Sequence, residues 1–307
     1  LWHEIPFNKL GIGLNSSEAQ ISDKKWFPYN KGGSYRKWYG NMDYVINYEN
    51  NGFEVKQYAT HLYKTASRTI KSMSEYFKQC ISWSKISTGN IAFRYYPQGF
   101  VFDVAGCSIF YKNEDRMYYD FGFINSKVAM SILAIIAPTM NFEAGHVASL
   151  PIIFDKNYLH EIKELVLENV TISKFEWNAF ETSWDFKCTA LLSVRKSVLF
   201  DNTDDIDLAE CYACWKNKCN EHFNHLKANE EELNRIFIGI YGLQDELTPE
   251  VEEKDVTVRK ADLQREIKSL ISYAVGCMFG RYSLDEEGLI YAGGEWESNR
   301  YTTFQLD

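Results

Sequence analysis

The sequence predicts an α/β (α+β) domain with a mixed or antiparallel sheet, followed by a mainly α-helical domain. Short β-type runs separated by Pro and Gly turns dominate residues 1–154, whereas apolar residues spaced three and four apart dominate residues 155–307. The charge also changes sign. Residues 1–154 carry 16 Lys and Arg against 12 Asp and Glu, a net of +4, and residues 155–307 carry 17 against 30, a net of −13. We therefore place a domain boundary between residues 154 and 155, and we expect the first part to attract a polyanion that the second part repels.

A basic and aromatic segment, KKWFPYNKGGSYRKWYGN, occupies residues 24–41. It contains five Lys and Arg, six aromatic residues and no acidic residue. Pro28 and the Gly32-Gly33 pair predict a loop rather than a helix. Because basic groups contact phosphates and Trp and Tyr rings stack on bases, this composition favours a loop that faces a polyanion. A loop held in place by its own aromatic rings fits the same composition.

Two β-hairpins are predicted in the first part. Residues 43–48 and 53–58 alternate in polarity around Asn50-Asn51-Gly52, which is a strong hairpin signal. Residues 82–110 predict a second hairpin around Pro97-Gln98-Gly99, whose aromatic, basic and hydroxyl side chains suit a nucleic-acid edge or backbone. An ordinary hairpin with surface tyrosines is the alternative for that stretch.

The remaining elements are predicted from caps and apolar stripes. Cap and start signals predict helices at 127–136 after Asn125-Ser126, after Thr248-Pro249, and at the capping pattern Ser283-x-x-Glu286. Apolar stripes predict helices from Leu159 onward, at 208–240 as one long helix or a broken pair, and at 259–275. Extended structure is expected at 118–124 and 141–153, and residues 60–79 are expected to form a helix or a mobile connection.

The composition is that of an ordinary globular chain, with 307 residues, 45% apolar and 24% charged. No apolar run approaches the roughly 20 residues that span a bilayer. No signal-peptide pattern opens the chain, so we expect a cytoplasmic protein without a membrane partner. The seven Cys at irregular spacings predict reduced thiols. Because the chain starts with Leu1 rather than Met, we expect it to be a piece of a longer protein.

No catalytic or metal-binding constellation is predicted. Cys211, Cys214, Cys219, His222 and His225 are of the right types to bind zinc. On one helix, however, Cys211 and His222 would lie about 16 Å apart, which is too far to share an ion. The G-x-x-x-x-G-K-[ST] phosphate loop and the G-x-S-x-G nucleophile turn are both absent from the sequence.

Several long segments resemble the C-terminal part of the PglX family of adenine-specific DNA methyltransferases from bacteriophage-exclusion (BREX) systems. The segments that carry the resemblance are KKWFPYNKGGSYRKWYGN (24–41), ISWSKISTGNIAFRYYPQGFVFDVAGCSIF (81–110), FGFINSKVAMSIL (121–133), NFEAGHVASLPI (141–152), FETSWDF (180–186) and LKANEEELNRIFIGIYGLQDELTPEV (226–251). Similar arrangements occur in fused type II restriction-methylation enzymes and, more distantly, in type I specificity subunits.

The resemblance implies a DNA target-recognition domain over residues 1–154 and an acidic helical spacer or interaction domain over residues 155–307. Such a chain would recognise a double-stranded DNA sequence for a site-specific N6-adenine methyltransferase in phage defence. The family's catalytic Asn/Asp-Pro-Pro-Tyr/Phe motif is absent, since none of the six prolines is next to another. We therefore expect no catalytic residue, metal or cofactor in this chain, and S-adenosylmethionine only in the full-length enzyme. The expected partners are DNA, the methyltransferase domain and other phage-defence proteins in the bacterial cytoplasm.

Twelve residues are the predicted DNA contacts. The predicted backbone contacts are Lys24, Lys25, Lys31, Arg36, Lys37 and Lys85, and the predicted groove or base contacts are Tyr29, Ser34, Arg68, Ser84, Ser87 and Arg94. Three alternatives stay open: a carbohydrate- or peptide-binding module that uses the aromatic loops, a protein-interaction fragment that uses the acidic helices, and a cysteine- or zinc-dependent enzyme. The first of these predicts binding that does not weaken with salt, in contrast to phosphate contacts.

Overall fold

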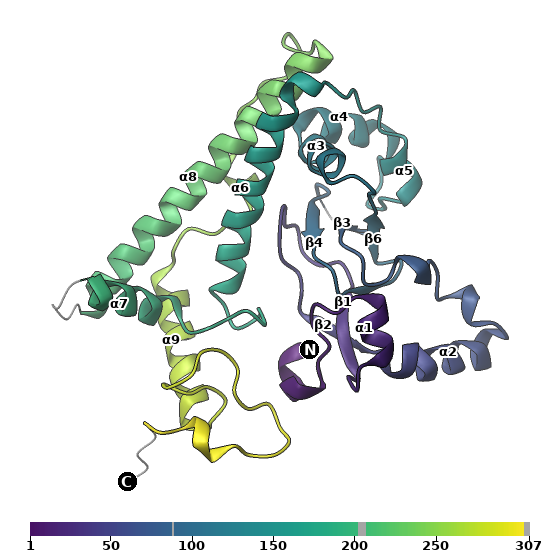
Figure 1. Ribbon diagram of the computed structural model, residues 1–307. Coiled ribbons are helices and arrows are strands. Elements are labelled where there is room, and N and C mark those ends of the chain that lie inside the picture. The colour runs from purple at the N-terminus through teal and green to yellow at the C-terminus, as the bar shows by residue number, and fades with distance from the viewer. Residues whose placement is uncertain (88, 202–206, 304–307) are drawn as a thin grey trace.

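The computed structural model describes residues 1–87, 89–201 and 207–303 and consists of an α/β part beside a set of long helices (Figure 1). Two of these helices, α6 (Leu159–Asn178) and α8 (Leu208–Tyr241), run side by side along one edge of the molecule. The strands and the first helices lie on the other side. This arrangement confirms the predicted fold class of an α+β part followed by helices.

The six described strands form two sheets of three strands each. In the first sheet, β1 (Trp26–Asn30) pairs antiparallel with β2 (Tyr44–Asn47) and parallel with β5 (Val101–Phe102). In the second sheet, β3 (Cys80–Ser84) pairs antiparallel with both β4 (Phe93–Tyr96) and β6 (Gly106–Ile109).

The predicted hairpin around Pro97-Gln98-Gly99 is wrong, because β4 and β5 on either side of this turn belong to different sheets. The turn packs instead against Gly13. The Gln98 side chain donates to the Gly13 carbonyl oxygen at 2.9 Å, and Gly99 has a φ of 111°, where a Cβ would stand 2.8 Å from the Gly13 nitrogen. The segment therefore carries the chain from one sheet to the other.

The predicted hairpin around Asn50-Asn51-Gly52 is also wrong, because β2 is followed by a helix, α2 (Glu49–Tyr63). These three residues have φ values of 50°, 59° and 70°, whereas a two-residue hairpin turn needs only two left-handed residues. After them the chain becomes helical. The predicted second strand has no buried side, since Phe53 and Tyr58 are 60% and 66% exposed.

Two further segments expected to be extended are helical. Residues 118–124 lie in α3 (Glu114–Ile124), which starts at Asn113, whose side chain accepts from the Arg116 nitrogen at 2.8 Å. Because α3 is buried on nearly every side, its apolar residues form no one-sided stripe by which periodicity could tell a helix from a strand. Residues 141–153 contain the short helix α5 (Ala144–Ala148).

The other helix predictions have mixed outcomes. The helix α4 (Lys127–Ile136) is confirmed with Ser126 as its cap, and α8 is one continuous helix that ends at Gly242. The helix start at Thr248-Pro249 is wrong, because Asn234 donates to the Pro249 carbonyl oxygen at 2.9 Å and holds this segment along α8. The capping pattern at Ser283 also starts no helix. There the Ser283 hydroxyl donates to the Arg300 carbonyl oxygen at 2.8 Å.

The remaining elements are two helices of the second part and a set of short ones. They are α7 (Ala190–Asp201), α9 (Leu263–Met278), α1 (Ser16–Ile21), and the 3₁₀ helices η1 (Trp2–Glu4), η2 (Phe7–Lys9), η3 (Ala66–Arg68), η4 (Met73–Glu75), η5 (Lys156–Tyr158), η6 (Glu253–Asp255) and η7 (Ser298–Arg300). Among the described helices, none alone is long and apolar enough to cross a bilayer; α3 and α4 reach that measure only as a pair, bent by 70°.

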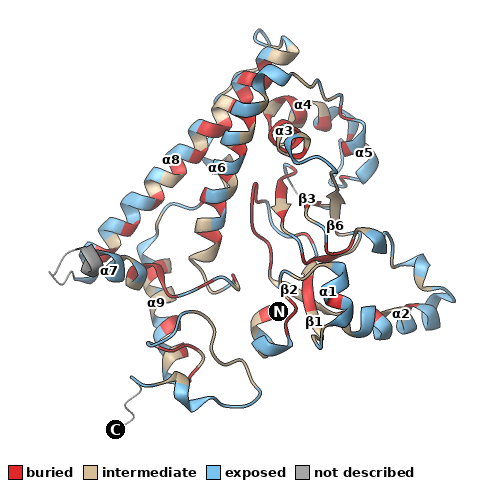
Figure 2. Cartoon of the chain, in the orientation of Figure 1, coloured by how far each residue is buried: buried red, intermediate tan, exposed pale blue. Residues whose placement is uncertain are grey.

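The largest hydrophobic core joins the α/β part to the long helices. Trp83 of β3, Phe121 of α3, Val166 of α6 and Phe237 of α8 belong to one cluster, and none of them is more than 1% exposed. Figure 2 shows the buried residues on the strands, on α3 and along α6 and α8. The α/β part is therefore fixed against the helices by a shared apolar core.

Candidate nucleic-acid interface

Two of the predicted DNA-backbone contacts, Arg36 and Lys37, are buried, with 8% and 6% of their surface exposed. Arg36 forms an ion pair with Glu176 of α6, and Lys37 forms one with Glu230 of α8. The Arg36 Nε also donates to the Tyr39 carbonyl oxygen at 2.7 Å. Because these donors are occupied by groups of the same chain, the predicted phosphate contacts of Arg36 and Lys37 do not fit this arrangement.

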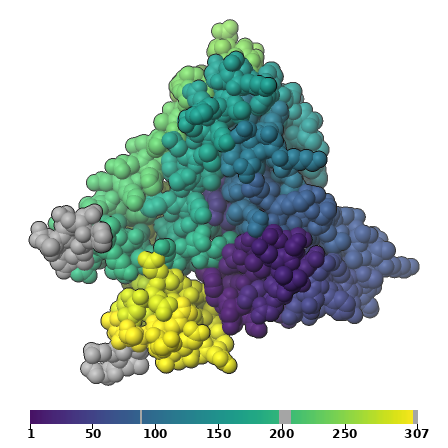
Figure 3. Space-filling model, viewed as in Figure 1, coloured from purple at the N-terminus to yellow at the C-terminus, as the bar shows by residue number. Residues whose placement is uncertain are grey.

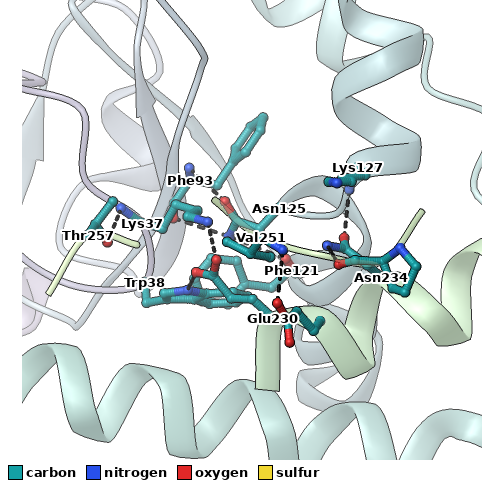
Figure 4. Close-up of polar contacts among 12 residues, drawn as sticks. Lys37, Trp38, Phe93, Phe121, Asn125, Lys127, Glu230, Asn234, Val251 and Thr257 are labelled. Carbon is teal, nitrogen blue, oxygen red and sulfur yellow. Dashed lines mark hydrogen bonds and ion pairs between the residues drawn. The ribbon is translucent and has the colours of Figure 1, made fainter. Parts of the chain in front are cut away.

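The Lys37 side chain belongs to a buried polar junction between the basic segment and the helices (Figure 4). Glu230 accepts a second hydrogen bond, from the Trp38 indole nitrogen at 2.7 Å. The Lys37 backbone nitrogen donates to the Thr257 hydroxyl at 3.1 Å, and on the far side the Lys127 nitrogen donates to the Asn234 side chain at 2.8 Å. We call Lys37, Trp38 and Glu230 the buried junction.

Arg94, a predicted groove contact, is also buried, at 1% exposure. Its guanidinium donates to the carbonyl oxygens of Ser34 and Arg36, at 3.4 and 3.3 Å, and to the Ser84 hydroxyl at 3.1 Å. The Ser84 hydroxyl in turn donates to the Gly33 carbonyl oxygen at 2.8 Å. Burial lowers the pKa of Arg94, as desolvation disfavours the charged form. Arg94 and Ser84 therefore hold the loop around Gly32-Gly33 in shape, and a base contact by Arg94 does not fit this arrangement.

Three other predicted backbone contacts, Lys24, Lys25 and Lys85, are partly buried and have partners in the same chain. The Lys24 Nζ donates to the Asn8 carbonyl oxygen at 2.7 Å, and the Lys25 Nζ lies 3.8 Å from a Glu49 carboxylate oxygen. The Lys85 Nζ lies 2.9 Å from a carboxylate oxygen of Glu143, and this hydrogen bond raises the pKa of Lys85.

The predicted polar groove contacts Tyr29, Ser34 and Ser87 form hydrogen bonds within the chain. The Tyr29 hydroxyl donates to Asp103 at 2.5 Å, and burial together with this carboxylate raises the pKa of Tyr29. The Ser87 hydroxyl donates to the Asn90 carbonyl oxygen at 2.9 Å. Ser34 is exposed, and its hydroxyl is 3.4 Å from the Asn41 side-chain oxygen.

Lys31 and Arg68 are the predicted cations that lie on the surface without an ion pair among the described residues. The Lys31 Nζ lies 5.1 Å from the centre of the Tyr44 ring, and the Arg68 guanidinium lies 5.4 Å from the centre of the Tyr63 ring. A cation above an exposed ring keeps its charge and its donors, so both side chains can reach a phosphate.

Three cations near Arg68 are not among the twelve predicted contacts. Lys56, Lys64 and Lys71 lie on α2 and the segment that follows it, and they are half-buried or exposed. A sequence signal for them exists: residues 55–74 contain four Lys and Arg and no Asp or Glu. The prediction of a β-strand at 53–58 concealed this signal, because it divided the run between two elements.

The cysteines and histidines of α8 do not form a metal site within the described residues, where no group of three or more possible ligands is placed to hold an ion. Cys211 and Cys219 are buried, and burial raises the pKa of the Cys219 thiol to about 12.

Comparison with known proteins gives two relatives and no matching family model. The chain is 43% identical, over 99% of its length, to "Adenine-specific methyltransferase PglX" of Lacticaseibacillus casei (strain Zhang), and 34% identical, over 92% of its length, to "Adenine-specific methyltransferase BrxX" of Escherichia coli O9:H4 (strain HS). It spans about a quarter of the length of these relatives, 25% and 23% respectively. The resemblance to PglX expected from the sequence is thereby confirmed: the chain corresponds to a segment, about a quarter, of the adenine-specific methyltransferases PglX and BrxX.

Proposed function

We propose that this chain recognises a double-stranded DNA target for an adenine-specific methyltransferase in phage defence, in the bacterial cytoplasm, and that residues 1–154 make the DNA contacts. The observation that carries this proposal is the separation of charge: net +4 in residues 1–154 against −13 in residues 155–307. A polyanion approaching this molecule is attracted by the α/β part and repelled by the helices. Both relatives are named adenine-specific methyltransferases, so methylation of adenine is the reaction that such recognition would serve.

The contact set depends on which cations stay available. Lys31 keeps its predicted role as a phosphate contact, and Arg68, which was predicted as a groove or base contact, stays available for DNA, since both are exposed. Lys24, Lys25 and Lys85 are in reach of solvent, and each would have to exchange its present partner for a phosphate oxygen. Arg36 and Lys37 serve instead to fix the α/β part against α6 and α8, so that a DNA target would be held at a defined distance from the helices.

We assign the methyl transfer itself to the part of the full-length protein that lies outside this chain. In open α/β sheets, ligands bind outside the carboxyl ends of the parallel strands, at the point where the strand order reverses, and this is where a site for S-adenosylmethionine would be expected. The described strands form two separate sheets of three, with a single parallel pair, and offer no such edge. We therefore derive no step through S-adenosylmethionine from these residues. The reacting adenine would be turned out of the duplex into the catalytic part.

The test is selection of bound duplexes from a randomised pool, by this chain alone and by the full-length protein. We expect one sequence to be enriched, and the affinity for it to fall with salt, with log K changing by about −0.9 per log unit of salt for each phosphate contacted. Lys31→Glu should lower the affinity and the salt slope, whereas the matched reversal Lys216→Glu, on the exposed side of α8, should change neither. If no sequence is enriched and salt has no effect, a carbohydrate- or protein-binding module is the better account.

A further inference from the structure

A basic projection, residues 55–74, stands out from the α/β part on the side away from α6–α9 (Figures 1 and 3). We call it the α2 arm. It consists of most of α2, the 3₁₀ helix η3 and the turn into η4. Its four cations are Lys56, Lys64, Arg68 and Lys71, and it has no acidic residue. The whole arm is therefore a surface of one sign.

The arm also exposes apolar side chains that a free surface helix normally buries. Tyr58 is 66% exposed, Leu62 50%, Tyr63 41% and Met73 43%. Tyr58 and Leu62 are four residues apart, so they lie on the same face of α2 one turn from each other. Ala59 is the one residue of the helical stretch after Gly52 that is buried within the described structure. Exposed apolar side chains of this size beside several cations indicate an interaction surface for another molecule.

The arm is anchored at both of its ends by one small core. Before it, Tyr48 is 5% exposed and packs against Phe27 and Phe77, with ring centres 6.2 and 5.6 Å apart. After it, Tyr76 packs against Tyr48 at 5.8 Å and against Phe102 at 4.9 Å. The chain thus leaves this core, forms the arm and returns to the same core. This anchoring fixes the position of both ends of the arm while the rest of the arm extends outward.

At the base of the arm, Gly52 allows close contact with this core. Its φ is 70°, and a Cβ there would stand 2.6 Å from the Tyr48 ring. The Lys56 Nζ donates to the Asn51 carbonyl oxygen at 2.5 Å and lies 5.7 Å from the Tyr48 ring. These contacts at Gly52 and Lys56 therefore fix the direction in which α2 leaves the core.

Resting on the DNA-recognition function proposed above, we propose that the α2 arm enters a groove of the DNA duplex. An α-helix with its side chains is about 10–12 Å across, and the major groove is about 12 Å wide. Lys64, Arg68 and Lys71 would contact phosphates at the groove edge, while Tyr58 and Leu62 would lie against sugars and bases. A protein partner fits this surface less well, because protein interfaces are depleted in Lys and three of the arm's four cations are Lys.

The experiment measures duplex binding of the full chain against salt for three variants. The first carries Lys64→Glu, Arg68→Glu and Lys71→Glu in the arm. The second is the matched control, with Lys156→Glu, Lys216→Glu and Lys268→Glu in the acidic part. The third carries Tyr58→Ala and Leu62→Ala. Circular dichroism and thermal melting check that each variant is folded.

We expect the arm charge variant to lose about a hundredfold in affinity at 0.15 M salt and to lower the salt slope by about 3, because three phosphate contacts disappear. The control should stay within about twofold of the wild type, since its lysines lie on the part that repels DNA. The Tyr58/Leu62 variant should bind more weakly with an unchanged salt slope, because it loses no charge.

Failure of the inference can be told from failure of the proposed function. If the wild-type chain and the full-length protein bind no duplex, the proposed function fails and the inference with it. If they bind and the arm variants bind as tightly, the inference alone is overturned. If the arm variants instead abolish self-association in sedimentation while duplex binding is unchanged, the arm is a protein-docking surface and the inference is also overturned.

Discussion

Removing Glu230 should destabilise the protein far more than removing a surface glutamate. Its carboxylate accepts from the Lys37 Nζ and from the Trp38 indole nitrogen, and Lys37 and Glu230 are 6% and 4% exposed. Glu230→Ala leaves a buried ammonium without a counter-charge, which costs about 3–5 kcal/mol. It also leaves an indole N–H without an acceptor, which costs about 1–3 kcal/mol. Since the two groups share one carboxylate, we expect a total loss of about 4–6 kcal/mol in the free energy of unfolding.

The assay is urea unfolding of a set of variants, with the free energy extrapolated to zero denaturant. Glu230→Gln keeps an acceptor for Trp38, so it should lose about 3 kcal/mol. Lys37→Met combined with Glu230→Gln removes the buried charge and should be more stable than Glu230→Ala. The control is Glu232→Ala, whose partner Arg235 is 59% exposed, and it should lose under about 1 kcal/mol. A loss of less than about 1 kcal/mol for Glu230→Ala at unchanged denaturant slope would refute the buried junction.

Two further predictions concern thiol reactivity and pH. Iodoacetamide at pH 8 should label the exposed Cys214 first. Cys80 and Cys219 should stay unlabelled until the protein unfolds, because burial raises the pKa of both thiols to about 12. Peptide mass spectrometry measures the labelling of each cysteine. Hydrogen bonds from Thr303 and its neighbour lower the pKa of Asp285 to about 2 from 3.8. Because the folded pKa is below the unfolded one, this stabilisation is present above pH 3.8 and is lost as pH falls toward 2. Faster hydrogen exchange at the Thr303 amide in that window would show it, and Asp285→Asn should remove the pH dependence.

Much of the helical part could be predicted from local sequence. The apolar stripe of α8 predicted one long helix or a broken pair, and the ends of the observed helix carry local signals as well, a capping box of Asp207 with Glu210 and a left-handed Gly242. Ser126 marked the start of α4 for the same reason. Such signals are not sufficient by themselves, because the capping pattern at Ser283 starts no helix, and α3 was predicted to be extended although Asn113 caps it. The residues of α3 are buried on nearly every side, and the Asn50-Asn51-Gly52 run is locally typical of a turn between strands. Only the packing of the whole chain decides whether a strand or a helix forms at these places.

By itself, the sequence determined the family, the fold class and the sign of charge on each part, because these depend on composition and on long matching segments. The tertiary structure decided which cations are available. Arg36 and Lys37 look like surface groups in an unbroken basic run, yet their counter-charges stand 140 and 193 residues away in the chain, on α6 and α8. No local pattern indicates such a partner. A basic residue in a sequence is only a charge, and whether it meets a phosphate or a buried carboxylate is settled by the helices that fold against it.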